Sequence, residues 1–294
     1  MAKFQLKMAT QLGEKTAADF GFVDFPIDPL KIAKAKNISV EALPAGSKGI
    51  SGALIFAGSD VALIYSTDYN NAGFERFSIS HELGHYFLPG HPEEILKQDG
   101  KHFSRANFTE NSSIELEADH FASGLLMPST LVRKLLGRNV IGLDGIIDLA
   151  DKSECSRTAA AIRAAECSEY PVAVIMSQGD KIAYAFMSDG FKKLGQLSFL
   201  RKGDALPASM TRTFNADTNN VLNTKRVCQE TTLGDWFGSS QCIALDEEII
   251  GLGSYGYTLT VLSSDELPAD PNEDDEDEEK DLEDRWTPRF AYGR

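Results

Sequence analysis

The sequence predicts an α+β protein with a helix-rich N-terminal domain and a β-rich C-terminal domain. Two observations support this fold class. In residues 74–88 and 111–127, apolar residues recur mostly every three or four positions, which is typical of buried helices. From residue 170 onward, β-branched and alternating apolar segments are separated by turn residues such as Gln178-Gly179-Asp180, which is typical of strands. A chain of 294 residues is long enough for two domains with cores of their own.

The first predicted helix covers residues 74–88 and contains the motif His81-Glu82-Leu83-Gly84-His85. Positions i and i+4 share one face of a helix, so the two histidines can bind one metal ion, with Glu82 beside it as a general base. Zinc acidifies a bound water, and an adjacent carboxylate can take its proton. The motif also arises by chance in ordinary helices. The buried helical pattern around it favours a metal site.

A catalytic zinc needs a third protein ligand, and a second predicted helix over residues 111–127 can supply one. Ser112 and Glu115 have the spacing of a capping box, which gives Glu115 a structural role. Glu117 lies about 200° around the helix from Glu115 and is therefore predicted to face the metal.

The motif and the segments Glu117-Ala118-Asp119-His120-Phe121-Ala122 and Leu125-Leu126-Met127-Pro128 together resemble the ImmA/IrrE family of bacterial metallopeptidases. The resemblance implies a zincin-like metallopeptidase domain over residues 1–140. It implies Zn²⁺, or else Mn²⁺, bound by His81, His85 and Glu117, with Glu82 as the base.

No carboxylate follows Glu117 by four positions, because that residue is Phe121. No acidic partner for a ligand histidine is predicted there. Asp119 is expected to be solvated or ion-paired.

Hydrolases need an electrophile that polarises the carbonyl besides the metal. Tyr65, Tyr86, His91 and His102 are candidates for this role, set against the commoner case of packed tyrosines and surface histidines. For His120, a supporting or surface role is expected rather than ligation.

Residues 52–56 and 61–65 are predicted to form a β-hairpin. A protease commonly binds substrate as an added strand at such an edge. The alternative is that both strands lie in the core, and the sequence leaves both interpretations open.

Residues 141–167 are predicted to form a pair of helices, with a turn at Ser153–Ser156 and Ser156 as cap. This segment resembles the helix-turn-helix-like part of the family. Only Lys152, Arg157 and Arg163 lie near it, too little positive charge for a DNA complex, so a structural bridge without direct nucleic-acid binding is favoured.

Residues 168–264 are predicted to form an α+β or β-rich domain. The family resemblance suggests a GAF-like sensor. Trp236 and Phe237 are expected in its core rather than in a ligand site.

Charge is distributed unevenly along the chain. The net charge is −15, and residues 265–294 hold 13 acidic and 4 basic residues. This segment is expected to be a disordered acidic tail with a short aromatic end at Trp286–Phe290, and a nucleic-acid mimic is the alternative. The four cysteines have no metal-site spacing and are expected to be reduced and packed.

The N-terminal residues lack a signal-peptide pattern, and no apolar run has membrane-span length. The sequence therefore predicts a cytoplasmic protein that has no membrane partner. Together with the resemblance, it predicts a zinc endopeptidase that cleaves a helix-turn-helix repressor and so relieves repression of a mobile element or a stress response. The alternative is a non-proteolytic regulatory module in which the metal is structural.

Overall fold

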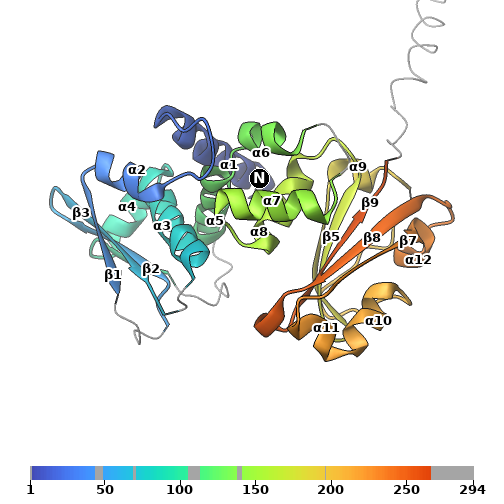
Figure 1. Ribbon diagram of the computed structural model, residues 1–294. Coiled ribbons are helices and arrows are strands. Elements are labelled where there is room, and N and C mark those ends of the chain that lie inside the picture. The colour runs from blue at the N-terminus through green and yellow to red at the C-terminus, as the bar shows by residue number, and fades with distance from the viewer. Residues whose placement is uncertain are drawn as a thin grey trace, which may run out of the picture.

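The computed structural model describes residues 2–43, 49–68, 71–104, 113–137, 141–195 and 197–265. A four-stranded sheet and a five-stranded sheet lie at opposite ends of the molecule, with several helices between them (Figure 1). The predicted acidic tail from residue 266 onward and the predicted capping residue Ser112 lie outside the described residues.

The N-terminal half contains both helices of the predicted metal site and the smaller sheet. Its elements are α1 (Ala2–Asp19), α2 (Pro29–Ala35), β1 (Ile38–Leu43), β2 (Gly52–Ala57), β3 (Asp60–Ser66), α3 (Ala72–Phe87), α4 (His91–Lys97), β4 (Lys101–Ser104), α5 (Ser113–Leu126) and α6 (Ser129–Leu136).

The smaller sheet has the strand order β1-β3-β2-β4. Strands β2 and β3 form the predicted antiparallel hairpin, and β1 runs parallel to β3. Both hairpin strands are interior, because β4 pairs with the other side of β2. Of the two interpretations that the sequence leaves open, the interior position of both strands favours the core and contradicts a free edge on the hairpin, because the edges among the described strands are β1 and β4.

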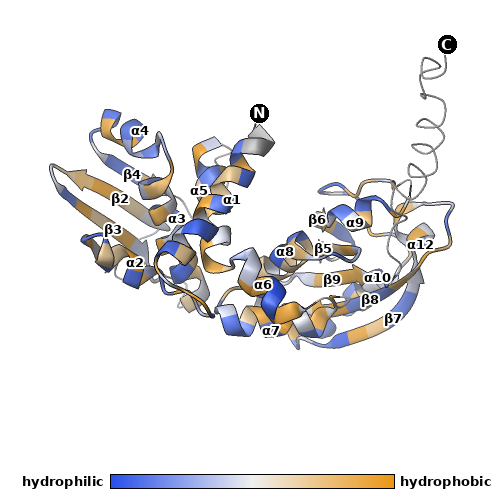
Figure 2. Ribbon diagram, turned by 90° about the horizontal axis from the view of Figure 1, so that it is seen from above, coloured by the Kyte–Doolittle hydropathy of each residue, from blue (hydrophilic) through white to orange (hydrophobic). Residues whose placement is uncertain are grey.

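Helix α3 covers one face of this sheet. Leu54 and Leu63 of the sheet and Ile79 and Leu83 of α3 are buried in one core. Apolar residues, orange in Figure 2, accordingly cover much of β2 and β3. Helix α5 packs against α3 and, on another side, against α1. The His81–His85 motif thus lies on a helix that is enclosed by the sheet and by α5.

A helical pair follows, α7 (Leu143–Ser153) and α8 (Arg157–Cys167). The predicted cap is confirmed, since the Ser156 hydroxyl accepts a hydrogen bond from the Ala159 amide at 3.1 Å. The apolar faces of both helices share a core with one face of the second sheet. The pair is therefore packed against the second sheet, and its assignment as a helix-turn-helix-like bridge stays a prediction.

The C-terminal half contains an antiparallel sheet of order β6-β5-β9-β8-β7. Trp236 and Phe237 are buried on the face opposite the bridge, which confirms their predicted place in the core. The GAF-like assignment stays a prediction. The elements of this half are β5 (Val172–Gln178), β6 (Lys181–Met187), α9 (Asp189–Lys192), α10 (Met210–Ala216), α11 (Thr218–Leu222), β7 (Arg226–Thr232), α12 (Leu233–Phe237), β8 (Ala244–Gly251), η1 (Gly253–Tyr255) and β9 (Thr258–Ser263).

All four cysteines are free thiols, as predicted. Cys167 is buried, whereas Cys228 and Cys242 are exposed, so the expectation that all are packed is wrong for these two. Within the described part of the chain, no helix combines the length and apolar character that a membrane crossing requires.

Candidate metal centre

Helix α3 positions the two motif histidines in the interior of the N-terminal half. Its first turn is capped by Asn71, whose side-chain oxygen accepts a hydrogen bond from the Phe74 amide at 3.1 Å. One turn apart on the same helix face, His81 and His85 point their Nε2 atoms at each other across 3.1 Å. The predicted pairing of these two histidines is therefore what the fold produces.

The glutamate that joins them is Glu115, and not the predicted Glu117. Glu115 Oε2 lies 3.2 Å from His81 Nε2, and Glu115 Oε1 lies 3.5 Å from His85 Nε2. Glu117 contacts His91 instead, at 3.4 Å. The two glutamates are about 200° apart around α5, so only one of them can face the histidines of α3.

A pair of small residues determines which turn of α5 meets the histidines. A Cβ added at Gly84 would lie 3.1 Å from the Ala118 Cα, so the two helices touch at this point. Glu115 is three residues before Ala118 and therefore lies beside the contact, on the same face of α5. The sequence contains this signal, because Gly84 separates the histidines and Ala118 is the small residue of the α5 apolar stripe.

His102 on the edge strand β4 completes a cluster of four side chains. Its Nε2 lies 3.0 Å from Glu115 Oε1, and its ring centroid is 4.1 Å from that of His85. One ligand atom from each of the four residues lies within 4.8 Å of the others; the four are His81, His85, His102 and Glu115.

The spacing of these atoms fits a metal ion. In a tetrahedral zinc site with Zn–N distances of about 2.05 Å, neighbouring ligand atoms are about 3.3 Å apart. The closest contacts between the cluster's side chains, 3.0 to 3.5 Å, are close to that value. Imidazole nitrogens with one carboxylate are a donor set that suits Zn²⁺ better than Mn²⁺, which prefers oxygen ligands.

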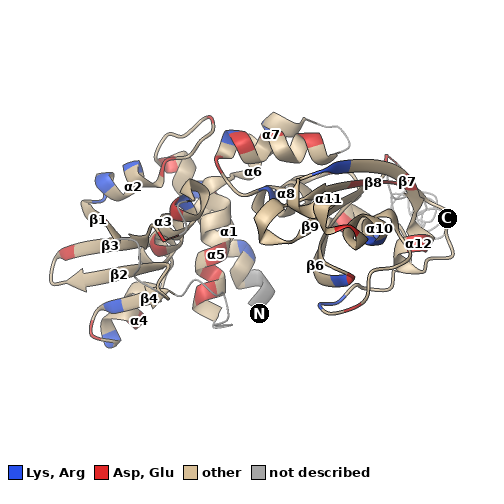
Figure 3. Ribbon diagram, turned by 60° about the horizontal axis from the view of Figure 1, so that its bottom comes forward, with Lys and Arg blue, Asp and Glu red and all other residues tan. Residues whose placement is uncertain are grey.

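Asp119 orients His81; of the two alternatives expected for Asp119, solvation or ion pairing, the structure shows the ion pair. Its Oδ1 lies 2.9 Å from His81 Nδ1, so the ring turns Nε2 toward the cluster. Burial by itself lowers the pKa of His81, but the neighbouring Asp119 and Glu115 carboxylates outweigh it and raise this pKa to about 10. Acidic residues of α3 and α5 are red in Figure 3. The charge that stabilises protonated His81 would equally stabilise a bound cation.

The pKa values of His85 and Glu115 are shifted toward the forms that bind a metal. Burial lowers the pKa of His85 well below its usual range, and nearby His81 and His102 lower it further. Burial alone would raise the pKa of Glu115, but its contacts with His102 and His81 hold it well below the usual range. A neutral imidazole and an ionised carboxylate are the forms that bind a metal.

Glu82 is fully buried beside the cluster. Its Oε1 accepts a hydrogen bond from the Ser104 hydroxyl at 2.6 Å, while Oε2 is buried without a hydrogen-bond partner among the described groups. Burial raises the pKa of Glu82. Gly52 makes this packing possible, because a Cβ there would lie 2.5 Å from Glu82 Oε1. A buried, unpartnered carboxylate oxygen next to four ligand groups is a position for a water or a metal-bound group.

The other residues predicted for the site lie outside the four-residue cluster. His91 lies 3.1 Å from His85, Nδ1 to Nδ1, so it supports a cluster residue. His120 contacts the Thr10 hydroxyl at 3.2 Å, between α5 and α1, and is not in the cluster. Tyr65 and Tyr86 pack against the N-terminal core. Of the candidate electrophiles, only His102 therefore reaches the cluster itself.

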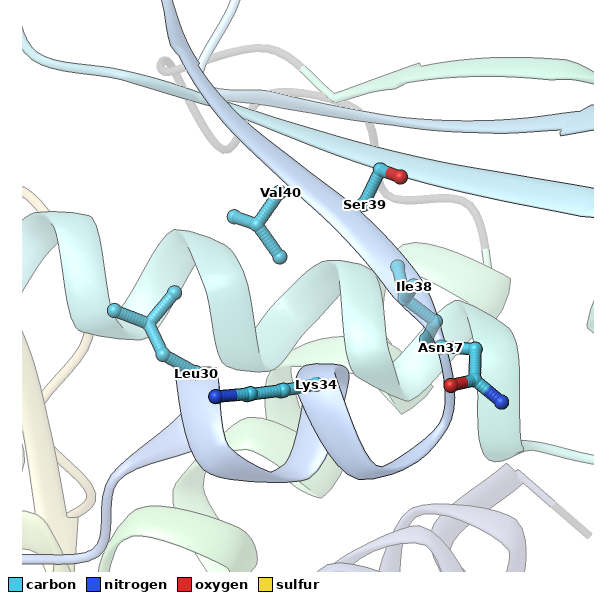
Figure 4. A pocket seen from close by; sticks show the side chains of 6 residues that line it. All are labelled: Leu30, Lys34, Asn37, Ile38, Ser39 and Val40. Carbon is cyan, nitrogen blue, oxygen red and sulfur yellow. The ribbon is translucent and has the colours of Figure 1, made fainter.

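A surface hollow of ≈ 440 Å³ lies beside β1 and α2 and is lined by Leu30, Lys34, Asn37, Ile38, Ser39 and Val40 (Figure 4). In the strand order, β1 and β4 are opposite edges of the sheet. The hollow is therefore separate from the cluster, which uses β4.

The fold and the site together define a class of protein: an α+β domain with a candidate divalent-metal centre. Two helices of this domain hold a cluster of histidines and a glutamate against an edge strand. Residues 33–165 match the family model of the IrrE N-terminal-like domain, peptidase family M78. The match confirms, over this domain, the predicted resemblance to the ImmA/IrrE family. The domain is of a metallopeptidase type.

Comparison with solved structures supports the fold alone. A "Mycobacterium tuberculosis transcriptional regulator" is similar with a TM-score of 0.54 and 15% sequence identity, over 87% of this chain and 76% of that one. No protein with curated annotation matches the chain.

Proposed function

We propose that this protein is a zinc-dependent endopeptidase whose metal is held by His81, His85 and Glu115. A bound zinc would polarise a peptide carbonyl and acidify a water. The observation that carries the proposal is Glu82, because a purely structural metal site needs no additional buried carboxylate, beside its four side chains, with one oxygen that has no hydrogen-bond partner among the described groups. The family match supports the same chemistry.

Each side chain around the metal position has a distinct role. Ser104 fixes one oxygen of Glu82, so that the other points in a defined direction and can accept a proton from the attacking water. The raised pKa of Glu82, caused by burial, makes it a stronger base than an exposed glutamate. Asp119 holds the His81 ring in place. His102 is near enough to the ligand atoms to stabilise negative charge on a substrate oxygen.

The Glu82→Gln variant tests the proposal. The amide has nearly the same shape but cannot accept the proton, so hydrolysis should fall by about 10²- to 10⁴-fold while zinc content stays near that of the wild type. The readouts are mass-spectrometric detection of cleavage in a peptide library and metal analysis of the same samples. Glu75→Gln, in the first turn of α3, is the matched control and should leave both unchanged. Equal cleavage by Glu82→Gln and wild type would contradict the proposal.

For the substrate we propose a helix-turn-helix repressor, whose cleavage would relieve repression of a mobile element or a stress response. Support comes from the family and from the structurally similar transcriptional regulator, although that likeness extends to the fold only. Incubation with purified helix-turn-helix repressors, including any that is encoded beside this gene, followed by mass spectrometry of the fragments, tests this. An intact repressor under conditions where library peptides are cleaved would refute it.

One observation favours the alternative, a non-proteolytic module with a structural metal. His102 brings the number of protein groups at the cluster to four, the number typical of structural zinc. If His102 closes the site, His102→Ala should open it to an added ligand such as azide in the cobalt-substituted protein. If the protein is instead a peptidase with an open metal position, azide should change the cobalt spectrum of the wild-type protein as well.

A further inference from the structure

We infer that His91 and Glu117 form a relay that positions His85 for the metal. The inference rests on the proposed metal centre and assigns a role to two residues outside the ligand set. Neither residue is close enough to join the four-residue cluster, yet both are linked to it by polar contacts.

The relay consists of two polar contacts, which connect His85 to Glu117 through the ring of His91. His85 directs Nε2 toward His81 and Glu115, so its Nδ1 is the atom that faces away from the cluster. That Nδ1 lies 3.1 Å from His91 Nδ1. On the far side of the second ring, His91 Nε2 lies 3.4 Å from Glu117 Oε2, near the long end of hydrogen bonding.

The chemistry of imidazole determines which nitrogen donates and which accepts in each contact of the relay. A neutral ring carries one N–H and one lone pair, and a metal needs the lone pair of His85 Nε2. The proton of His85 is then on Nδ1 and is donated to the lone pair of His91 Nδ1. His91 must in turn carry its proton on Nε2, which it donates to the Glu117 carboxylate. Each contact therefore determines the tautomer of one ring, and the two contacts together hold the orientation of the His85 ring.

The chain places His91 there by a specific turn. Gly90, which follows α3, has φ of 90°, a left-handed conformation that favours glycine. This turn brings the first residue of α4 back over the end of α3, where His91 is buried and His85 is fully buried. Glu117 comes from α5 and also accepts a hydrogen bond from Ser113 at 3.3 Å. Three helices thus contribute to the relay.

The two ligand histidines are therefore supported in different ways. His81 has a carboxylate, Asp119, directly on Nδ1. His85 has a second histidine between its Nδ1 and the carboxylate of Glu117. Groups that orient metal-bound histidines typically change metal affinity by about 10- to 100-fold when they are removed.

The test is zinc affinity of the full-length protein, measured by competition with a chromogenic chelator. His91→Phe keeps an aromatic ring but has no acceptor, so it should weaken zinc binding by about 10- to 100-fold. His91→Asn places an oxygen near the position of Nδ1 and should recover most of the loss. Because both residues belong to one line, the double variant His91→Phe with Glu117→Gln should bind zinc no more weakly than His91→Phe alone. His120→Phe, also a histidine at a helix interface, is the matched control and should bind zinc like the wild type.

The cobalt-substituted proteins give a second readout, since the visible spectrum reports ligand geometry. His91→Phe should shift this spectrum, and His91→Asn should shift it less. If His91→Phe does not fold, as shown by circular dichroism, then His91→Asn and Glu117→Gln carry the test, with affinities expected between those of the wild type and His85→Ala.

Unchanged affinity in all His91 and Glu117 variants overturns the relay. So do equal losses in His91→Phe and His91→Asn, which would mean packing alone, or losses that add in the double variant. These outcomes do not depend on proteolysis. A protein that binds zinc but cleaves nothing refutes the proposed function and leaves the relay standing. A wild-type protein that binds zinc no better than His85→Ala refutes both.

Discussion

Glu115 is the carboxylate that contacts all three histidines of the cluster. It is within 3.5 Å of three imidazoles, and no lysine or arginine ion pair with it is seen among the described residues. Without a metal, protonated His81 balances this charge, in keeping with a pKa raised to about 10 by Asp119 and Glu115 against the effect of burial. A divalent cation can take the place of that proton, so metal binding and proton release are coupled here.

The first residue-scale prediction separates the two glutamates of α5. Glu115→Ala removes a ligand atom and should abolish stoichiometric zinc binding. Glu117→Ala removes only the end of the relay and should keep one zinc, bound more weakly. Elemental analysis after gel filtration, followed by chelator competition, distinguishes them. Full zinc occupancy in Glu115→Ala and its loss in Glu117→Ala would restore the ligand set predicted from the sequence.

A second residue-scale prediction concerns Gly52. An added methyl group would lie 2.5 Å from Glu82 Oε1 and 3.0 Å from its Cγ, so Gly52→Ala must displace the buried carboxylate. We expect a loss of about 1–3 kcal/mol in the free energy of unfolding and a loss of hydrolysis, with zinc retained. Gly190→Ala is the control, because its new Cβ has only ordinary contacts of 3.5 Å or more. Wild-type hydrolysis in Gly52→Ala would show that the position of Glu82 is not critical.

At the scale of elements, the contact between α3 and α5 determines the geometry of the centre. Gly84→Ala would gain about 1 kcal/mol in helix propensity. Its Cβ, however, would meet the Ala118 Cα, O and Cβ at 3.1 to 3.3 Å, and two of these are backbone atoms that cannot rotate away. We therefore expect a net lower melting temperature and weaker zinc binding, since Glu115 moves away from the histidines.

Gly145→Ala in α7 is the matched control for this prediction, because its Cβ would meet only the end of the Leu136 side chain, at 3.2 Å. Thermal unfolding followed by circular dichroism, with chelator competition, checks both variants. A Gly84→Ala protein that is more stable and binds zinc normally would contradict the prediction.

The elements differ in how far the sequence can predict them. Helix α3 has a capping residue and a regular apolar period, and both are local signals, so the motif is correctly predicted to lie on a buried helix. Strand β4 has neither, because Lys101–Ser104 contains one apolar residue, and it is a strand only through pairing with β2. For this reason no pattern assigns Ser104 to the site, and His102 is predicted there only as one of four candidate electrophiles and not as a member of the ligand cluster. Glu115 is not predicted as a ligand because the choice between two faces of α5 depends on a contact between helices.

At the scale of the whole molecule, the start of α3 is held by groups that are distant in sequence. Arg76 forms an ion pair with Glu154 in the α7–α8 turn, at 3.1 Å, and donates a hydrogen bond to the Ile27 carbonyl. Asn71 donates a hydrogen bond to the Tyr255 hydroxyl of η1 in the C-terminal half, at 3.1 Å. Helix α3, with its capping residue, thus contacts both the bridge and the C-terminal half. No local pattern in the sequence indicates these contacts, because each joins residues that only the folded chain brings together.

The last prediction is that the Arg76 to Glu154 pair couples the bridge to the metal helix. Glu154 is 53% exposed, so Glu154→Gln should cost at most about 1 kcal/mol of unfolding free energy. Arg76 is mostly buried, and Arg76→Met also leaves the Ile27 carbonyl without this donor, so it should cost about 1–3 kcal/mol.

The double variant tests the coupling, because the loss of Glu154 should lower the free energy of unfolding little further once Arg76 is absent. Denaturant unfolding of the four proteins gives the interaction free energy, and Lys152→Met, from an exposed ion pair on α7, should change stability by less than about 0.5 kcal/mol. Additive losses would mean that the two residues stabilise the protein independently. A coupling that also weakens zinc binding in Arg76→Met would show that the position of the bridge reaches the metal centre through the first turns of α3.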